Sequence, residues 1–252
     1  MSVDPISRDV FQHEVVSIAE EMSVALRRSA FSAIIWDMID YACGLLDPEG
    51  NTIAQAPTIP AQLGIMPTAF RHMIRAIPLS EWHEGDVIIC NDPYLGCTHT
   101  PDLVLFSPVW FEGRIIAITS TVAHHIDVGG RVPGSESATA LELYEEGLII
   151  PPLKLFDRGK PNETFFRIFA RNVRDPKAST GDINAQVAAC RTGERRLKEL
   201  AEKYGAEGFA RHVAAVFDYS ETYLRRALRG AVVRAAEAEI FTEDDAASDA
   251  LM

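Results

Sequence analysis

Residues 91–130, NDPYLGCTHTPDLVLFSPVWFEGRIIAITSTVAHHIDVGG, decide the fold. Two apolar runs, 103–110 and 114–123, flank the segment Phe111-Glu112-Gly113. Runs rich in β-branched and aromatic residues, joined by three residues that include a glycine, predict an antiparallel β-hairpin. The same stretch holds three of the seven histidines of the chain, which a hairpin alone does not need. The sequence therefore indicates that the open end of this hairpin carries chemistry.

The register of the predicted hairpin determines which side chains meet. A three-residue loop makes the numbers of paired residues sum to about 224. Asp102 then lies opposite Val122, and Thr100 lies opposite His124. Because side chains alternate between the two faces of a strand, Asp102 and His124 share one face and His125 points to the other. A shift of the pairing by one residue would exchange the two histidines.

His99, Asp102 and His124 converge at the open end of this hairpin. Two imidazoles and one carboxylate can hold a divalent metal and leave positions open for water or substrate, an arrangement that suits Mn, Fe or Zn. Asp92 and Asp127 are nearby candidates to accept a hydrogen bond from the other ring nitrogen of a ligand histidine. The alternative is that each residue caps a turn or ends a strand and binds nothing.

Other motifs in the stretch remain open to two interpretations. Cys97 is either a thiol nucleophile or further ligand beside His99, or a buried cysteine without chemistry. The glycine-rich segment 129–135 either presents backbone amides to an anion or forms an ordinary turn. The chain contains no GxxxxGK[ST], GxGxxG, GxSxG or HExxH motif. We therefore expect no ATP-binding loop in this chain.

The chain as a whole predicts an α+β fold. Its mostly antiparallel central sheet carries an N-terminal helix and a C-terminal helical pair. The expected single domain, 1–252, comprises a helix and hairpin (1–80), a β-rich site region (81–160), and a helical region with a tail (161–252). Within these parts the spacing of apolar residues, turns and glycines predicts helices over 8–32, 66–77, 182–203 and 207–229, a hairpin over 41–57 and a proline-rich connection over 151–163. Asp182 is the expected N-cap of the helix 182–203, Gly205 is the expected break after it, and the polar tail is expected to lack a clear terminal element.

Composition narrows the class of partner and the compartment. The formal net charge is -12, with 36 acidic and 24 basic residues, and no dense basic cluster is available to neutralise nucleic-acid phosphates. Neither a secretory signal nor an apolar run long enough to cross a bilayer is present. The four cysteines are scattered without a CxxC pair. We therefore expect a cytoplasmic protein that binds neither nucleic acid nor membrane.

The stretch 91–135, the segment EGLIIPPLKL (146–155) and the earlier IIWDMIDYACGLLDPEGNTIAQAPTIPAQLG (34–64) resemble the hydantoinase B/oxoprolinase family. Its members include N-methylhydantoinase B subunits, the second half of 5-oxoprolinase, and the α subunits of acetone and acetophenone carboxylases. The resemblance extends from about residue 4 to residue 230 and corresponds to the N-terminal half of the family's length.

This resemblance implies a function and two partners. A hydantoinase A-type subunit would use ATP to activate the substrate, and a further polypeptide would supply the missing C-terminal half. This chain would then assist hydrolysis of a cyclic amide such as a hydantoin, oxoproline or lactam. The alternatives are a carboxylase α-type subunit that acts on a ketone, and a truncated assembly subunit without catalysis.

The resemblance also implies roles for individual residues. The HxxD pair and the downstream histidine of the carboxylase branch hold manganese, and they match His99, Asp102 and His124 here. Asp92, His125 or Asp127 would then orient a ligand or transfer a proton, because carboxylates and imidazoles are the usual acid–base groups.

Overall fold

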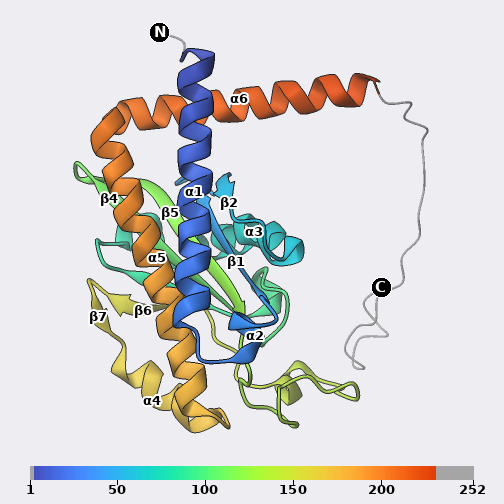
Figure 1. The fold of residues 1–252 in the computed structure, drawn as a ribbon. Coiled ribbons are helices and arrows are strands. Elements are labelled where there is room, and N and C mark those ends of the chain that lie inside the picture. Colours follow the sequence, from blue (N-terminus) through green and yellow to red (C-terminus); the bar gives the residue numbers. More distant parts are fainter. Residues whose placement is uncertain (1–2, 231–252) are drawn as a thin grey trace.

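An antiparallel sheet with helices on both faces forms the fold (Figure 1). The structure is a computed structural model that describes residues 3–230. Its strands pair in the order β2-β1-β5-β4-β3-β6-β7, and every pairing is antiparallel. The strands are β1 (Tyr41–Leu46), β2 (Thr52–Gln55), β3 (Val87–Cys90), β4 (Asp102–Phe111), β5 (Arg114–His124), β6 (Leu153–Asp157) and β7 (Lys160–Pro161).

Helices occupy both ends of the described chain, so the predicted α+β class is confirmed. The α-helices are α1 (Pro5–Ser29), α2 (Ala33–Trp36), α3 (Pro60–Ala76), α4 (Glu163–Asn172), α5 (Pro176–Tyr204) and α6 (Ala206–Gly230). Short 3-10 turns are η1 (Leu79–Glu81), η2 (Pro93–Leu95) and η3 (Leu143–Glu146). The helices α5 and α6 are the predicted C-terminal pair. None of the helices in the described range is both long and apolar enough to span a membrane.

Local sequence explains where α1 begins and which face it buries. The side chain of Asp4 accepts hydrogen bonds from the backbone nitrogens of Ile6 and Ser7, and Pro5 occupies the first turn. Arg27 and Arg28 lie in the last turn, where the helix dipole favours cations. One stripe of the helix is buried against the sheet and α5, and consists of Phe11, Val15, Ile18, Ala19, Met22 and Leu26.

The two faces of the sheet have different neighbours. Even-numbered positions such as Val104 and Phe106 pack on α3 in one apolar cluster. Odd-numbered positions such as Leu103 and Leu105 pack on α4 and α5 in another. Because of this alternation, Asp102 and His124 belong to the α3 face.

Helix α5 approaches the sheet closely at Gly193. A Cβ atom there would collide with Sδ of Met22 on α1 and would lie 2.8 Å from Cγ2 of Thr119 on β5. Only glycine fits this close contact of two helices and a strand. The same close packing lets α5 cover the face of the sheet opposite α3.

The hairpin of β4 and β5 confirms the predicted pairing of strands but corrects its register. The turn has two residues, Glu112 and Gly113, both with positive φ (50° and 76°), so Phe111 pairs with Arg114. A bulge after Val109 adds one more residue of offset. Each change shifts the sum of paired residue numbers by one.

Together these two changes place Asp102 opposite His124 instead of Val122. The prediction of Val122 as the partner of Asp102 was therefore wrong. An offset of two residues leaves the faces unchanged, because side chains alternate with a period of two. The prediction that Asp102 and His124 share a face holds, while their neighbours across the strands differ.

Other boundaries also differ from the predictions. Asp182 is not the N-cap of the long helix, because the side chain of Asp175 caps α5 by accepting a hydrogen bond from Ala178 N. Asp182 lies inside the helix, and its Oδ1 accepts hydrogen bonds from Phe31 N and Ser32 N. The proline-rich connection contains β6 and β7, α4 was not predicted, and α3 starts at residue 60 instead of 66. The hairpin of β1 and β2 and the break at Gly205 are confirmed. The tail predicted to lack a clear element lies outside the described residues from 231 onward.

Candidate metal centre

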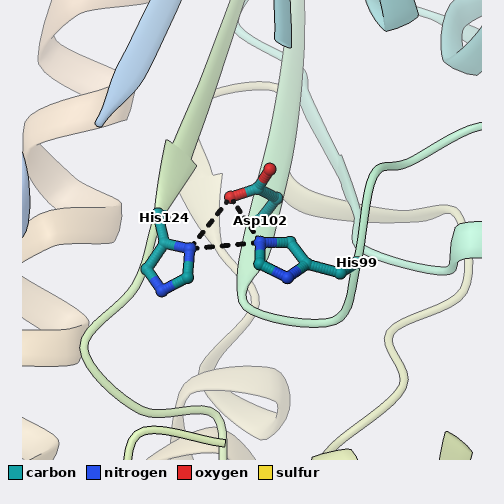
Figure 2. A group of neighbouring side chains, drawn as sticks. All are labelled: His99, Asp102 and His124. Carbon is teal, nitrogen blue, oxygen red and sulfur yellow. Dashed lines mark hydrogen bonds and ion pairs between the residues drawn. The ribbon is translucent and has the colours of Figure 1, made fainter. Parts of the chain in front are cut away.

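His99, Asp102 and His124 meet where β4 begins and β5 ends (Figure 2). Asp102 is the first residue of β4 and His124 is the last residue of β5, and the two are directly paired. His99 comes from the turn before β4, in which its carbonyl accepts a hydrogen bond from Asp102 N at 3.1 Å. The sheet therefore fixes two of the three side chains, and a tight turn adds the third.

The donor atoms of these residues form a small triangle. Nε2 of His99 lies 3.1 Å from Nδ1 of His124, and Oδ1 of Asp102 lies 3.3 Å and 3.4 Å from these two nitrogens. Ligands that bind a metal at about 2.0–2.2 Å with angles of about 90–110° are themselves about 2.8–3.6 Å apart. The distances between these donor atoms are thus compatible with a single divalent ion.

Hydrogen bonds keep Asp102 ionised in a buried position. Burial alone would raise its pKa, but hydrogen bonds from His124, His99 and Thr98 outweigh that effect and hold the pKa well below its usual range. The Thr98 hydroxyl donates to Oδ2. This contact leaves Oδ1 directed at the two histidines, as a metal ligand requires.

Gln62 connects a second carboxylate to the centre from α3. Its amide nitrogen donates to Oδ1 of Asp40 at 2.8 Å and lies 3.4 Å and 3.5 Å from the two oxygens of Asp102. The carbonyl of Asp40 also accepts from His124 N at 3.0 Å. Burial raises the pKa of Asp40, although His124 lowers it in part. The pKa of Asp40 is therefore shifted in the opposite direction from that of Asp102.

Glu136 reaches His99 from the loop that follows β5. Its Oε1 lies 3.5 Å from Nδ1 of His99, the ring nitrogen that points away from the centre. A carboxylate at this position favours the tautomer with hydrogen on Nδ1 and frees Nε2 to bind a metal. The His99 side chain is 36% exposed, so the centre opens toward solvent on this side.

His125 belongs to the opposite face of the sheet and is fully buried. Nε2 of Gln186 donates to the carbonyl of Leu103, so Oε1 of Gln186 is left to accept from Nε2 of His125 at 3.0 Å. Burial lowers the pKa of His125 and favours the neutral ring. The structure does not bring His125 into the group of His99, Asp102 and His124.

The carboxylate of Asp127 is hydrogen-bonded within a loop and takes no part in the triangle of His99, Asp102 and His124. Its oxygens accept from the backbone nitrogens of Gly129, Gly134 and Arg174 and from the Arg174 guanidinium at 2.7 Å. Burial raises the pKa of Asp127, but these hydrogen bonds lower it by more. Because Asp127 already accepts from the amides of the glycine-rich segment, that segment forms an ordinary turn.

Asp92 and Cys97 also have local partners. Oδ1 of Asp92 accepts from Tyr94 N at 2.9 Å and caps η2. The Cys97 thiol is buried, and its contact with Cys90 and its burial both raise its pKa, so it stays protonated. Neither residue contributes an atom to the triangle of His99, Asp102 and His124.

A second cluster, His83, Asp86 and Asp157, has comparable spacing but already contains a cation. Nζ of Lys154 lies 2.8 Å from Oδ2 of Asp86 and 3.5 Å from Oδ1 of Asp157. The ammonium group therefore supplies the positive charge that this cluster needs. Among the described residues, the triangle at the end of β5 is the better candidate.

Four residues of the centre were missed by the sequence analysis: Asp40, Gln62, Thr98 and Glu136. Thr98 carried a signal, because it precedes Asp102 by four residues in the same polar turn. Gln62 and Glu136 carried none, since only the packing of α3 and the course of the loop after β5 bring them close.

Comparison with known proteins shows which protein family the sequence matches. The pattern of the hydantoinase B/oxoprolinase family matches residues 4–250. An uncharacterized protein of Methanocaldococcus jannaschii is 41% identical over 229 residues, which cover 90% of this chain and 41% of that protein.

Two solved structures share the fold. The ATP-dependent caprolactamase of Pseudomonas jessenii matches with a TM-score of 0.85 and 33% identity over 91% of this chain and 40% of that one. A nucleotide-free acetone carboxylase matches with a TM-score of 0.78 and 21% identity over 84% of this chain and 28% of that one, a likeness of fold alone. The chain thus spans about two fifths of the length of the first two relatives.

Proposed function

Because the chain belongs to the hydantoinase B/oxoprolinase family, we propose that it is the metal-binding part of an ATP-dependent hydrolase that opens cyclic amides. The observation that carries this proposal is the triangle of donor atoms from His99, Asp102 and His124. Two neutral nitrogens and one carboxylate oxygen are a donor set that Mn, Fe and Zn accept. The set leaves coordination positions free for water and substrate.

In this proposal a neighbouring group orients each of the three ligand side chains or fixes its position. Thr98 holds one oxygen of Asp102 and leaves the other for the ion, and Glu136 selects the tautomer of His99. Pairing with β4 fixes the position of His124. A divalent ion bound there would polarise a substrate oxygen and lower the pKa of a bound water.

Proton transfer near the ion is best assigned to Asp40. Asp92, His125 and Asp127 were the expected candidates, and each of them has local partners away from the triangle. Asp40 is linked to Asp102 through Gln62, and burial raises its pKa. Carboxyl groups are common general acids and bases, and burial brings the pKa of Asp40 closer to neutral than that of an ordinary aspartate.

In this proposal a partner subunit uses the ATP. We assign ATP use to a hydantoinase A-type subunit, which would activate the substrate, because relatives named as subunits of hydantoinase and caprolactamase support a partner subunit. The likeness to the caprolactamase supports a cyclic amide such as a lactam, hydantoin or oxoproline as substrate. The acetone carboxylase likeness concerns the fold alone and gives less support to ketone carboxylation.

A reconstituted assay tests the proposal. The metal-loaded protein is combined with a hydantoinase A-type subunit, and ATP-dependent ring opening of 5-oxoproline, hydantoin and caprolactam is measured. We expect Asp102→Asn to abolish ring opening while the partner still consumes ATP. His83→Ala, in the cluster that contains Lys154, should keep full activity. Ring opening that survives Asp102→Asn would contradict the proposal.

A further inference from the structure

The chain between β5 and β6 forms a loop that leaves the end of the sheet and returns to it (Figure 1). The two limbs of this loop meet at a neck. Leu148 N donates to the carbonyl of Val128 at 2.8 Å, and Arg131 N donates to the carbonyl of Glu145 at 2.7 Å. A Cβ atom at Gly130 would lie 2.5 Å from the carbonyl oxygen of Glu145, so the limbs touch backbone to backbone. Residues 131–146 therefore form a compact Ω-loop with its ends held together.

Buried groups hold the base of this loop. Ser135 is 1% exposed, and its hydroxyl accepts from Val128 N and donates to the carbonyl of Gly129, both at 2.8 Å. On the return limb, a Cβ atom at Gly147 would lie 2.7 Å from the carbonyl oxygen of Val128. Between these anchors every residue from 136 to 146, a stretch we call the tip segment, is at least partly exposed. Segments with few buried contacts open at low cost in free energy, so the tip segment can move while its base stays fixed.

The tip segment contacts the turn that carries His99 at both of its ends. Oε1 of Glu136, its first residue, lies 3.5 Å from Nδ1 of His99. The hydroxyl of Thr100 donates to the carbonyl of Glu146, its last residue, at 3.3 Å and lies 3.4 Å from the Glu146 carboxylate. The side of the candidate centre at His99 is the side that opens toward solvent. The tip segment is therefore attached beside the opening of the centre.

The middle of the tip segment presents two large apolar side chains to solvent. Leu141 and Tyr144 have exposed fractions of 62% and 79%. Neither packs in any of the apolar clusters that the described residues form. The backbone between them is ordered locally, because Leu141 N donates to Oε2 of Glu145 at 2.9 Å. Neighbouring apolar groups exposed in this way mark a site of interaction.

We infer that the tip segment is a lid that closes over the candidate centre when a cyclic amide is bound, and that Leu141 and Tyr144 then cover the ring. This inference rests on the proposed function. The donor atoms of His99, Asp102 and His124 are all polar and suit the amide oxygen, but they offer nothing to the methylene groups of a ring. The lid supplies that apolar contact, and its closure excludes water from the reacting bond.

The nature of this contact predicts an order of ligands. Apolar burial contributes in proportion to the apolar area that is covered. Caprolactam has the most methylene groups, 5-oxoproline has fewer and hydantoin has the fewest. The contribution of Leu141 and Tyr144 to binding should decrease in the same order. A lid that acted only by holding the fold together would affect the three ligands equally.

Direct binding measurements test the lid without turnover. The full chain is loaded with Mn²⁺, and binding of caprolactam, 5-oxoproline and hydantoin is measured by titration calorimetry. We expect Leu141→Ala/Tyr144→Ala to weaken caprolactam binding at least about tenfold, because two large side chains lose their contact with the ring. Hydantoin binding should change least. Ile168→Ala is the matched control, because Ile168 is an exposed apolar residue of α4, and it should bind all three ligands like the native chain.

Limited proteolysis measures closure itself. Chymotrypsin cleaves after exposed aromatic residues, and the fragments are identified by mass spectrometry. We expect caprolactam at about ten times its Kd to slow cleavage after Tyr144 about tenfold, because bound and closed chains then outnumber free chains by that factor. Cleavage after Tyr223, which is 67% exposed on α6, should keep its rate. Circular dichroism and Mn²⁺ affinity are measured for each variant, and both should match the native chain.

The possible outcomes separate the lid from the proposed function. A native chain that binds none of the three ligands, binding that is equal in Leu141→Ala/Tyr144→Ala and the native chain, or equal losses for all three ligands would each overturn the lid. Ring opening in the reconstituted assay that is unaffected by this double variant would overturn the lid and leave the proposed function intact. Binding that depends on Tyr144 without ring opening in that assay would support the lid and contradict the proposed function.

Discussion

Asp102 and His124 are directly paired residues of β4 and β5, and Oδ1 of Asp102 lies 3.4 Å from Nδ1 of His124. Their relative position is set by the backbone ladder of the longest hairpin in the sheet, while His99 joins them from a turn. Sites built on strands hold their geometry better than sites built on loops. The candidate centre therefore depends on the register of this hairpin.

The turn of the hairpin offers a test of stability without a change in the centre. Glu112 has a φ of 50°, and nothing lies within 4 Å of a side chain added at Gly113. Asn tolerates positive φ better than Glu, and Asn-Gly is the preferred pair for this turn. We expect Glu112→Asn to raise the free energy of unfolding by about 0.5–1 kcal/mol in urea denaturation, the range typical of turn optimisation. Gly113→Val should lower it and would contradict this account of the turn if it did not.

The hairpin also shows which features of the site could be predicted from the sequence. Alternation and turn composition were enough to place Asp102 and His124 on one face, because face assignment depends only on whether an offset is even. They were not enough to fix the register. The bulge after Val109 follows Pro108, a residue that signals irregularity in a strand but not the size of the offset.

Contacts between distant segments account for the rest. Asp182 has the type of side chain that caps helices, and the sequence alone could not show that it accepts from Phe31 N and Ser32 N, about 150 positions away. Gln62 reaches Asp102 only through the packing of α3 on the sheet. Such partners depend on tertiary structure, which local patterns do not encode.

Removing the amide of Gln62 should weaken the candidate centre. Gln62→Leu would leave Asp40 and Asp102 without their shared donor, and the two carboxylates would repel each other more strongly. We expect the affinity for Mn²⁺ or Zn²⁺ to fall about 10–100-fold, as is typical for loss of a residue that orients a ligand. Competition with a chromophoric chelator measures this change. Gln55→Leu, at an exposed position on β2, is the control and should leave the affinity unchanged.

Glu136 should act through the tautomer of His99 and not through its charge alone. Glu136→Gln retains an oxygen that accepts from Nδ1, so it should bind metal nearly as well as the native chain. Glu136→Ala removes the acceptor, and we expect about threefold to tenfold weaker binding, less than for a buried partner because Glu136 is exposed. The same chelator competition distinguishes them. Equal affinities for the Ala variant and the native chain would exclude this role.

The metal-free protein should show a pH dependence that originates at His99. A hydrogen bond from His99 to Asp102 raises the pKa of this histidine, although burial opposes the shift. A raised folded-state pKa contributes stability that is present below the unfolded value of about 6.5 and is lost as the pH rises through the folded pKa. We therefore expect the free energy of unfolding, measured in EDTA, to fall as the pH rises through the folded-state pKa of His99.

His99→Gln should remove this part of the pH dependence, and His83→Gln should not. Metal affinity should change with the opposite sign, increasing over the same pH range, because a ligand imidazole must lose its proton. Urea denaturation with EDTA and metal titrations at matched pH values measure the two trends. A pH profile of stability that is identical in His99→Gln and the native chain would contradict the assignment.

The most direct test of the candidate centre is the metal content of the purified chain. The chain is isolated from cells grown with added Mn, Fe and Zn, and its metals are quantified by inductively coupled plasma mass spectrometry beside His124→Ala and His83→Ala, with folding checked by circular dichroism. The account predicts about one divalent ion per chain in the native protein and in His83→Ala, and none in folded His124→Ala. A folded native chain without metal, or an ion retained in His124→Ala, would contradict it.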